Sequence, residues 1–210
     1  MRAVAYTLLG VISAGLTGVL AGRAAGAVSH NRMAPWIVGR AAGLSAYLML
    51  VALVLLGLLL SHPWRSRVRR PSSITRIRVH AVLAVLVLVL TALHVIVLAT
   101  DRFAGVGWWG ALLPMRASYR PVPVTLGVIG AWTGLLAGLT AALAGRLPAR
   151  AWWPIHKVAG VSLVLAWLHG VLGGGDSYAL RWVYVGSGML VAVVALSRYV
   201  ARTTAEQVLH

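Results

Sequence analysis

Six long apolar segments constrain the fold of this chain more than any other feature of its sequence. A membrane-spanning helix needs about 20 consecutive, mostly apolar residues. Lipid offers no hydrogen-bond partners, so a single spanning segment forms an α-helix that satisfies its own backbone. Only 10% of the 210 residues are charged, and these lie mainly between the segments. We therefore predict an all-α integral membrane protein, a six-transmembrane-helix bundle with helices at about residues 4–22, 36–60, 77–99, 122–145, 154–172 and 181–199.

Tryptophan and arginine residues indicate where the helices end and how they are oriented. Tryptophan prefers the membrane–water interface, and strongly basic loops stay in the cytoplasm. The tryptophans near predicted helix ends are Trp36, Trp64, Trp108, Trp109, Trp152, Trp153 and Trp182. The loop after the second predicted helix contains Arg65, Arg67, Arg69, Arg70, Arg76 and Arg78. We therefore predict a multi-pass protein of the plasma membrane with both termini in the cytoplasm, in which residues 1–200 form one transmembrane domain and residues 201–210 a cytoplasmic tail.

Two stretches depart from this simple pattern. The first apolar segment follows Arg2 and has small residues near Ala21, so it also has features of a signal peptide that is removed from the mature protein. Whether residues 1–22 are retained is therefore left open. The longest predicted outer loop, at about 100–121, contains glycine and proline residues that argue against a helix there.

The net charge and the lack of cysteine exclude several function classes. The chain has no cysteine, which excludes disulfides, thiolate metal sites, iron–sulfur clusters and cysteine nucleophiles. The net charge of +16 would suggest nucleic-acid binding in a soluble protein. Here the basic residues lie between apolar segments and are not interleaved with aromatic residues as on a nucleic-acid surface. We assign them to membrane topology and to contacts with anionic lipid, and we expect no nucleic-acid partner.

Four histidines in the apolar segments form two pairs with nearly equal spacing. His80 and His94 are fourteen residues apart, and His156 and His169 are thirteen apart. Each pair spans roughly 20 Å along a helix that rises about 1.5 Å per residue. The two predicted helices run in the same direction, so His80 and His156 should lie towards the cytoplasm and His94 and His169 towards the outside. Ionisable residues at membrane depth suggest a functional site, here with two imidazoles at each of two depths.

A heme is the ligand that best suits two facing imidazoles in apolar surroundings. Its iron takes one histidine on each face, and six-coordinate iron favours electron transfer over oxygen binding. Histidines that only hydrogen-bond neighbouring helices are the simpler alternative. A non-heme metal site fits less well, because the pairs are too far apart to share one ion. A proton-coupled transporter would place acids in the membrane, whereas the acids of this chain, Asp101, Asp176 and Glu206, lie in loops or the tail.

One spacing conflicts with a straight helix. At 100° per residue, fourteen residues bring His94 to within about 40° of the face of His80, but thirteen residues leave His169 about 140° from His156. We therefore expect either a locally overwound helix near Gly160 or two hemes attached at different azimuths.

These residues resemble the ferric reductase-like transmembrane domain family, which includes ferric reductases, NADPH oxidases and, more distantly, the membrane subunit of a bacterial methionine sulfoxide reductase system. The specific part is His-x13-His and His-x12-His on two parallel helices. GRAAGLSAYLMLVALVLLGLL, LLPMRASYRPVPVTLG and WWPIHKVAGVSLVLAWLHGVLGGGDS are also similar to bacterial members, over about residues 36–178. The resemblance implies an inner heme b between His80 and His156 and an outer heme b between His94 and His169. It also implies electron flow from a cytoplasmic-side donor to an extracytoplasmic acceptor.

The chain departs from this family in its source of electrons. Ferric reductases and NADPH oxidases continue into a domain that binds FAD and NADPH, whereas we find no dinucleotide-binding unit here in which a G-x-G-x-x-G turn joins a strand to a helix. We therefore expect a stand-alone oxidoreductase component whose donor is a separate flavoprotein, carrying FAD or FMN, or a membrane quinol. Two alternatives are left open: a membrane subunit that takes quinol or flavin electrons for a partner reductase, and a non-redox scaffold or permease with structural histidines.

Basic and small residues near the histidines are candidates for supporting roles. Arg76 lies four residues before His80, on the same helix face, and Arg40 lies near the outer start of the second predicted helix. Both are candidates to bind heme propionates, with Lys157 as a weaker one, although arginines at these positions also suit anchoring to lipid headgroups. The remaining candidates are Gly43, Gly127, Gly134 and Gly160 for close approach, Trp167 between the two levels, and Trp108, Trp109 and Arg116 as an outer cover.

Overall fold

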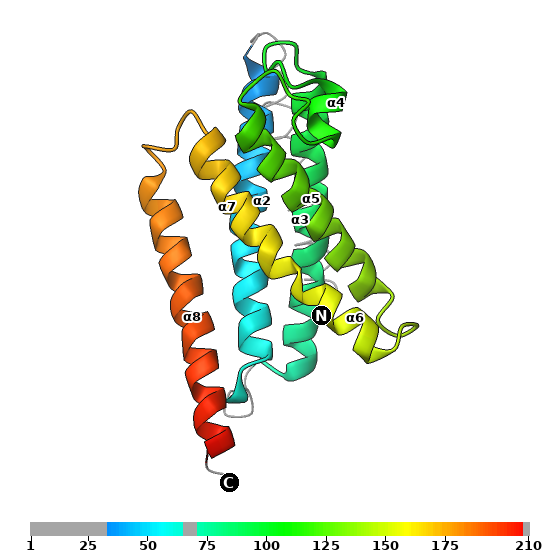
Figure 1. Ribbon diagram of the computed structural model, residues 1–210, viewed down its shortest axis with the longest axis vertical. Coiled ribbons are helices and arrows are strands. Elements are labelled where there is room, and N and C mark those ends of the chain that lie inside the picture. The colour runs from blue at the N-terminus through cyan, green and yellow to red at the C-terminus, as the bar shows by residue number, and fades with distance from the viewer. Residues whose placement is uncertain (1–32, 65–70, 208–210) are drawn as a thin grey trace, which may run out of the picture.

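A computed structural model describes residues 33–64 and 71–207, and within these ranges the chain forms helices and no strand (Figure 1). The helix predicted at 4–22 lies outside the described residues. The helices are α2 (Ala34–Leu60), α3 (Ser73–Thr100), α4 (Gly107–Leu112), α5 (Pro121–Ala142), α6 (Ala149–Lys157), α7 (Ala159–Gly173) and α8 (Arg181–Gln207). Among them, α2, α3, α5, the α6–α7 stretch and α8 give five segments long and apolar enough to cross a membrane. The all-helical, multi-pass prediction is confirmed for this part of the chain.

Two antiparallel helix pairs form the centre of the molecule. α2 packs along α3, and α5 packs along α7, while α2 also contacts α7 and joins the two pairs. α8 lies at the edge of the bundle beside α2 and α7 (Figure 1). A core of buried side chains links α2, α3, α7 and α8; its members are Tyr47, Leu50, Val51, Val87, Leu163 and Tyr184.

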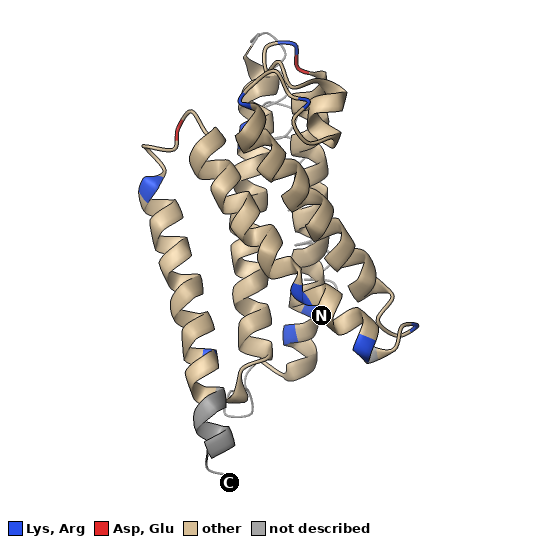
Figure 2. Ribbon diagram, viewed as in Figure 1, with Lys and Arg blue, Asp and Glu red and all other residues tan. Residues whose placement is uncertain are grey.

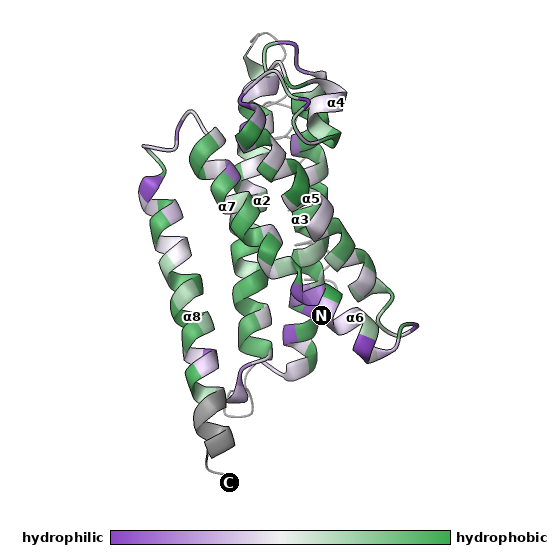
Figure 3. Cartoon of the chain, viewed as in Figure 1, coloured by the Kyte–Doolittle hydropathy of each residue, from purple (hydrophilic) through white to green (hydrophobic). Residues whose placement is uncertain are grey.

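The surface has the distribution of polarity that a bilayer requires. Charged residues lie towards the two ends of the bundle, and the faces between them are apolar (Figures 2 and 3). Large apolar side chains such as Val85, Val89 and Leu196 are exposed on α3 and α8. Soluble proteins rarely expose apolar surface of this extent to water, whereas lipid tails favour contact with it. The structure therefore supports a multi-pass membrane protein.

Local signals in the sequence explain where the helices begin. Pro35 and Pro121 lie in the first turns of α2 and α5, where the missing N–H costs no helical hydrogen bond. The Ser72 hydroxyl accepts a hydrogen bond from the backbone N–H of Thr75, 3.2 Å away, and so caps α3. These starts agree with the predicted boundaries to within a few residues. α8 runs without a break to Gln207, so most of the segment assigned to the tail is helical.

The prediction of an irregular outer loop at 100–121 is wrong for its central part. Gly107–Leu112 forms the short helix α4. Gly105 and Gly107 have φ angles of +62° and +64°, a region that glycine enters without strain, so they turn the chain into the helix rather than prevent it. Residues 105–110, GVGWWG, match the G-x-G-x-x-G pattern. No strand precedes them in the described chain, so they are not a dinucleotide-binding unit.

The helix predicted at 154–172 is two helices, α6 and α7, with a break at Val158. There the Val158 N–H bonds the Ile155 carbonyl at 2.9 Å, and the Val161 N–H bonds the Val158 carbonyl at 2.9 Å. Hydrogen bonds between residues three apart belong to the tighter 3₁₀ turn, which has about 3.0 residues per turn instead of 3.6. The overwinding expected near Gly160 is therefore present, and it rotates His156 relative to His169.

Candidate functional site

The four membrane histidines meet in the two pairs expected from their depths. The ring centroids of His80 and His156 are 6.2 Å apart with an interplanar angle of 68°. Those of His94 and His169 are also 6.2 Å apart, at 79°. One ring of each pair comes from α3 and the other from α6 or α7. The break at Val158 is what allows both pairs to form, because a straight helix would direct His156 and His169 to different sides.

All four histidines line one cavity of about 1390 Å³ that runs between the helices. Pockets for a single small ligand usually measure about 300–1000 Å³. Protein interiors are otherwise packed as densely as organic crystals, so a cavity of this size has room for a large ligand. Its walls are mostly apolar, with small residues from α2 and α5 facing the histidines.

Backbone carbonyls orient the rings of His94 and His169. His94 Nδ1 lies 2.6 Å from the carbonyl oxygen of Gly39, and His169 Nδ1 lies 2.8 Å from that of Pro123. A carbonyl oxygen only accepts, so in both rings Nδ1 carries the proton and donates it. Nε2 then keeps its lone pair and is the nitrogen available to a metal. Metal-binding histidines usually donate a hydrogen bond from the ring nitrogen that does not bind the metal. This hydrogen bond fixes both the tautomer and the ring orientation.

A glycine one turn after each of these carbonyls lets the ring approach. A Cβ atom at Gly43 would lie 2.6 Å from His94 Nδ1, and one at Gly127 would lie 2.7 Å from His169 Nδ1. Real Cβ contacts are essentially never so short. Gly43 follows Gly39 by four residues, and Gly127 follows Pro123 by four. The α2–α3 and α5–α7 pairs therefore build their histidine contacts in the same way.

The contacts at the His80 and His156 level are longer, and among the described residues only His80 has a neighbouring glycine. His80 Nδ1 is buried near the Leu53 carbonyl without a hydrogen bond of normal geometry to any described residue, and a Cβ at Gly57 would lie 3.2 Å from its ring. His156 Nδ1 lies 3.5 Å from the Ala137 carbonyl. Aromatic rings supply the additional support here, because Trp153 stacks on His156 with centroids 6.2 Å apart and Trp152 lies 5.7 Å away.

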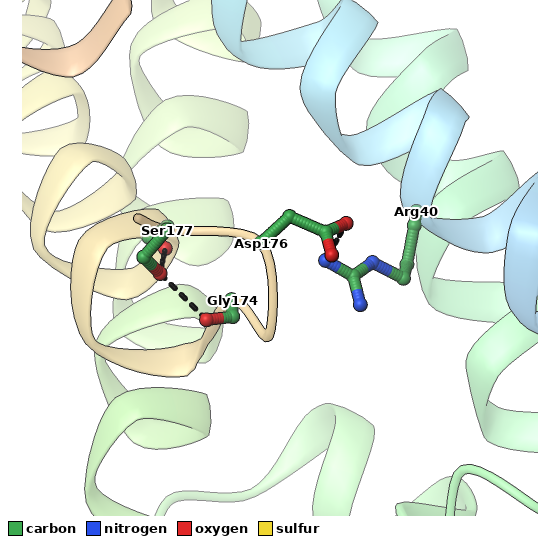
Figure 4. Close-up of polar contacts among 5 residues, drawn as sticks. Arg40, Gly174, Asp176 and Ser177 are labelled. Carbon is green, nitrogen blue, oxygen red and sulfur yellow. Dashed lines mark hydrogen bonds and ion pairs between the residues drawn. The ribbon is translucent and has the colours of Figure 1, made fainter. Parts of the chain in front are cut away.

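The predicted cations lie in different places. Arg40 lines the cavity at the His94 and His169 end and forms an ion pair with Asp176 in the α7–α8 loop (Figure 4). Its guanidinium also lies 5.3 Å from the ring centroid of Trp36. Arg76 does not line the central cavity. It lines a separate small pocket near the end of α2, and its Nη2 donates to Ser73 Oγ at 3.1 Å. Lys157 lines the central cavity beside His156.

The other predicted residues divide into those at the cavity and those outside it. Gly134 lines the cavity and packs against Ser162, whose Oγ would lie 2.9 Å from an added Cβ, and Gly160 lines it with nothing within 4 Å. Trp167 packs away from the cavity, with Nε1 donating to the Tyr184 carbonyl at 3.0 Å. The outer loop contributes to the cavity wall through Val106, Ala111 and Tyr119, and not through Trp108, Trp109 or Arg116.

Sequence reasoning missed three residues that the structure brings to the site: Gly57, Asp176 and Arg198. A signal for Gly57 was present, because Gly43 and Gly57 are fourteen residues apart, as are His80 and His94 on the neighbouring antiparallel helix. Asp176 and Arg198 had no such signal. Their roles depend on how α8 and the loop before it pack against the remaining helices.

The donor set and its spacing fit a bis-histidine heme. Two metal–imidazole bonds of about 2 Å in line, plus the distance from each nitrogen to its ring centre, separate the centroids of two axial imidazoles by about 6 Å. Both pairs have this separation. Among the described residues, no three metal-ligating side chains converge on one point. No family model matches the chain, and no curated protein or solved structure matches it either.

Proposed function

We propose that this chain is a di-heme b transmembrane electron-transfer protein. The observation that supports it most is the pair of facing imidazoles at each of two depths, with ring centroids 6.2 Å apart, inside one apolar cavity. When bound, heme supplies a one-electron centre whose potential depends on its axial ligands and surroundings. Histidine on both faces leaves no open coordination position, which suits electron transfer rather than oxygen binding.

The chain itself supplies ligands, orientation and an apolar surrounding. Protonated Nδ1 atoms on His94 and His169, held by backbone carbonyls, would leave Nε2 of each ring free to bind the heme iron. Gly43 and Gly127 let each ring lie close to its carbonyl. The exposed apolar faces of α3 and α8 keep the cavity within the bilayer, where water is excluded.

The direction of transfer and the partners follow the resemblance to ferric reductase-like membrane domains. In this proposal the protein lies in the plasma membrane as a six-helix domain with both termini in the cytoplasm. His80 and His156 bind the inner heme, and His94 and His169 the outer heme. A separate flavoprotein or a membrane quinol donates electrons on the cytoplasmic side, and an acceptor outside receives them. The chain would then be the heme-binding component of an oxidoreductase.

An optical spectrum of the detergent-purified protein tests the proposal. The protein is expressed with ample heme, and spectra are recorded before and after reduction with dithionite, with heme quantified per chain. We expect a sharp reduced α-band of b type and about two hemes per chain. A folded, monodisperse and colourless protein would contradict the proposal and favour a scaffold or permease whose histidines only join helices.

Single histidine variants then assign the two levels. His94→Ala and His169→Ala should each remove the outer heme and leave the inner one, and His80→Ala and His156→Ala should do the reverse. The measurement is heme per chain together with the reduced spectrum. If every single variant lost both hemes while remaining folded, two independent sites would be ruled out.

A further inference from the structure

The two ends of the central cavity differ in charge. At the His94 and His169 end, Arg40 is neutralised by Asp176. At the His80 and His156 end, the described lining residues include Lys157 and Arg198 and no acid. The acids whose side chains the structure describes lie towards the opposite end, Asp101 directly after α3 and Asp176 in its ion pair with Arg40. The cavity therefore has an excess of positive charge at one end.

Arg198 is the more constrained of the two cations. It lies within the candidate span Arg181–Ala201 and is partly buried. Its Nε donates to the Ser61 carbonyl at 3.3 Å and to Ser61 Oγ at 2.9 Å. Ser61 lies one turn after Gly57, which contacts His80. These two contacts attach α8 to the end of α2 and place Arg198 at the His80 and His156 end of the cavity.

The partners of Arg198 do not neutralise it. A guanidinium remains charged at every accessible pH, and its five donors suit the planar geometry of a carboxylate. Both recorded hydrogen bonds use Nε and end on neutral oxygens. A basic side chain near the end of a membrane span either reaches the lipid headgroups or pairs with an opposite charge. The contacts to Ser61 direct Arg198 towards α2 and the cavity. No described acid lies at this end of the cavity, so the expected partner is an anionic ligand.

We propose that Arg198, supported by Lys157, binds the propionate carboxylates of the heme at the His80 and His156 level. This inference rests on the proposed function and assigns the anion-binding residue at one of its two sites. Lys157 directly follows His156 and has its Nζ 5.6 Å from the ring centroid of Trp153, which stacks on His156. Arg198 and Lys157 therefore lie on different helices, α8 and α6, at the same end of the cavity.

Arg76, the candidate from sequence, does not share this placement. It lines a small pocket with Leu60, Ser73 and Ile77 rather than the central cavity. The structure thus separates two arginines that lie near the same end of the bundle. Arg198 has access to the ligand cavity, and Arg76 does not. Arg78, exposed on the same turn of α3, supplies a matched control for the removal of one positive charge at this end.

The experiment compares heme with and without its carboxylates. The His94→Ala protein, which keeps only the inner site, is prepared without heme and titrated with hemin or with hemin dimethyl ester, whose propionates are esterified. Arg198→Gln should weaken hemin binding about ten- to a hundredfold, as expected for the loss of a charge-assisted hydrogen bond, and leave ester binding unchanged. Arg198→Lys should restore part of the hemin affinity. Arg78→Gln should change neither.

The unmutated inner site gives a readout that does not depend on how a variant folds. Hemin should bind it more tightly than the ester, and the midpoint potential of the bound heme should change with pH for hemin only, because only hemin carries titrating carboxylates near the iron. Equal affinity for the two ligands would overturn the proposal.

Other outcomes separate the possible failures. Equal loss of hemin and ester binding in Arg198→Gln would mean that Arg198 only joins α8 to α2. Hemin loss in Arg76→Gln instead would assign the propionate to Arg76. If Arg198→Gln left hemin binding unchanged but lost a co-purifying anionic phospholipid, detected by mass spectrometry, the anion bound by Arg198 would be a lipid phosphate. Each of these three results overturns the proposal. A wild-type chain that bound no heme would overturn the proposed function as well, whereas wild-type protein with two hemes would confine the failure to Arg198.

Discussion

At the scale of single residues, the site depends on two glycines whose lack of a side chain lets a histidine ring reach a backbone carbonyl. His94 reaches the Gly39 carbonyl because Gly43, one turn further along α2, has no side chain in the way. His169 reaches the Pro123 carbonyl past Gly127 in the same manner. Each glycine therefore serves the orientation of a ring, which is a different task from the close helix–helix approach for which small residues in membrane helices are best known.

Gly43→Ala should remove the outer heme. The added Cβ would lie 2.6 Å from His94 Nδ1, so the ring has to move and its hydrogen bond to Gly39 is lost. Loss of such a supporting contact typically weakens metal affinity about 10- to 100-fold. Heme per chain should fall from about two towards one, with the inner heme retained.

Gly186→Ala, on α8, is the matched control, because no atom lies within 4 Å of the position that its Cβ would take and Gly186 does not line the cavity. It should keep both hemes. If Gly43→Ala also kept both hemes at unchanged affinity, the glycine would have no role in orienting His94.

At the scale of helices, the break between α6 and α7 decides whether both histidine pairs can form. The 3₁₀-type hydrogen bonds on either side of Val158 rotate α6 relative to α7 and bring His156 opposite His80. Deleting Val158 should turn His156 away by about 100°, the rotation per residue of an α-helix, and remove the inner heme alone. The measurement is heme per chain with the reduced spectrum.

Deleting Gly145 is the control for this change. Gly145 lies in the α5–α6 loop with nothing near its Cβ position, so the loop can shorten without rotating α7. Both hemes should be retained. Loss of the outer heme in the Val158 deletion would show instead that α7 shifts as a whole and that the two levels are not independent.

α8 is joined to the other helices by a few polar contacts rather than by extensive packing. The Tyr47 hydroxyl hydrogen-bonds to Ser187 Oγ, and Trp167 Nε1 donates to the Tyr184 carbonyl. Interhelical hydrogen bonds in membranes contribute about 0.6 kcal/mol on average and at most about 1.7 kcal/mol. A double-mutant cycle with Tyr47→Phe and Ser187→Ala should therefore give a coupling energy of about 0.5–1.5 kcal/mol in denaturant unfolding, with heme content unchanged. A coupling energy of zero would mean that the hydrogen bond between Tyr47 and Ser187 does not stabilise the packing of α8.

The depth of each histidine in the bundle could be predicted from sequence, but the direction in which a side chain faces around its helix axis could not. The spacings of His80 to His94 and of His156 to His169 sufficed to match the pairs by depth, because rise per residue is nearly constant along a helix. The direction in which a residue faces depends on breaks and on neighbouring helices. Arg76 shares a face with His80 by spacing, yet it lines a different pocket, whereas Arg198 reaches the cavity only because α8 packs on the end of α2. Sequence periodicity contains no information on that packing.

At the scale of the whole molecule, the charges at the two ends of the bundle bear on its orientation. α2 and α5 end, and α3 and α6 begin, at the His80 and His156 end. The sequence between α2 and α3 carries Arg65, Arg67, Arg69 and Arg70. Basic loops are retained in the cytoplasm during membrane insertion. This end of the cavity should therefore face the cytoplasm. Under the proposed function, that orientation would put the end that contains Arg198 on the side of the electron donor.

The lack of cysteine makes this orientation directly measurable, because a single introduced cysteine is the only thiol in the chain. Gly145→Cys, in the α5–α6 loop, should react with a membrane-impermeant maleimide only after the cells are opened. Arg102→Cys, which is exposed after α3 at the other end, should react in intact cells. Neither position contacts the cavity, so both proteins should keep their hemes and provide a check on folding. The reverse labelling pattern would mean that the protein has the opposite orientation in the membrane. Under the proposed function, the His94 and His169 level would then receive electrons from the cytoplasm.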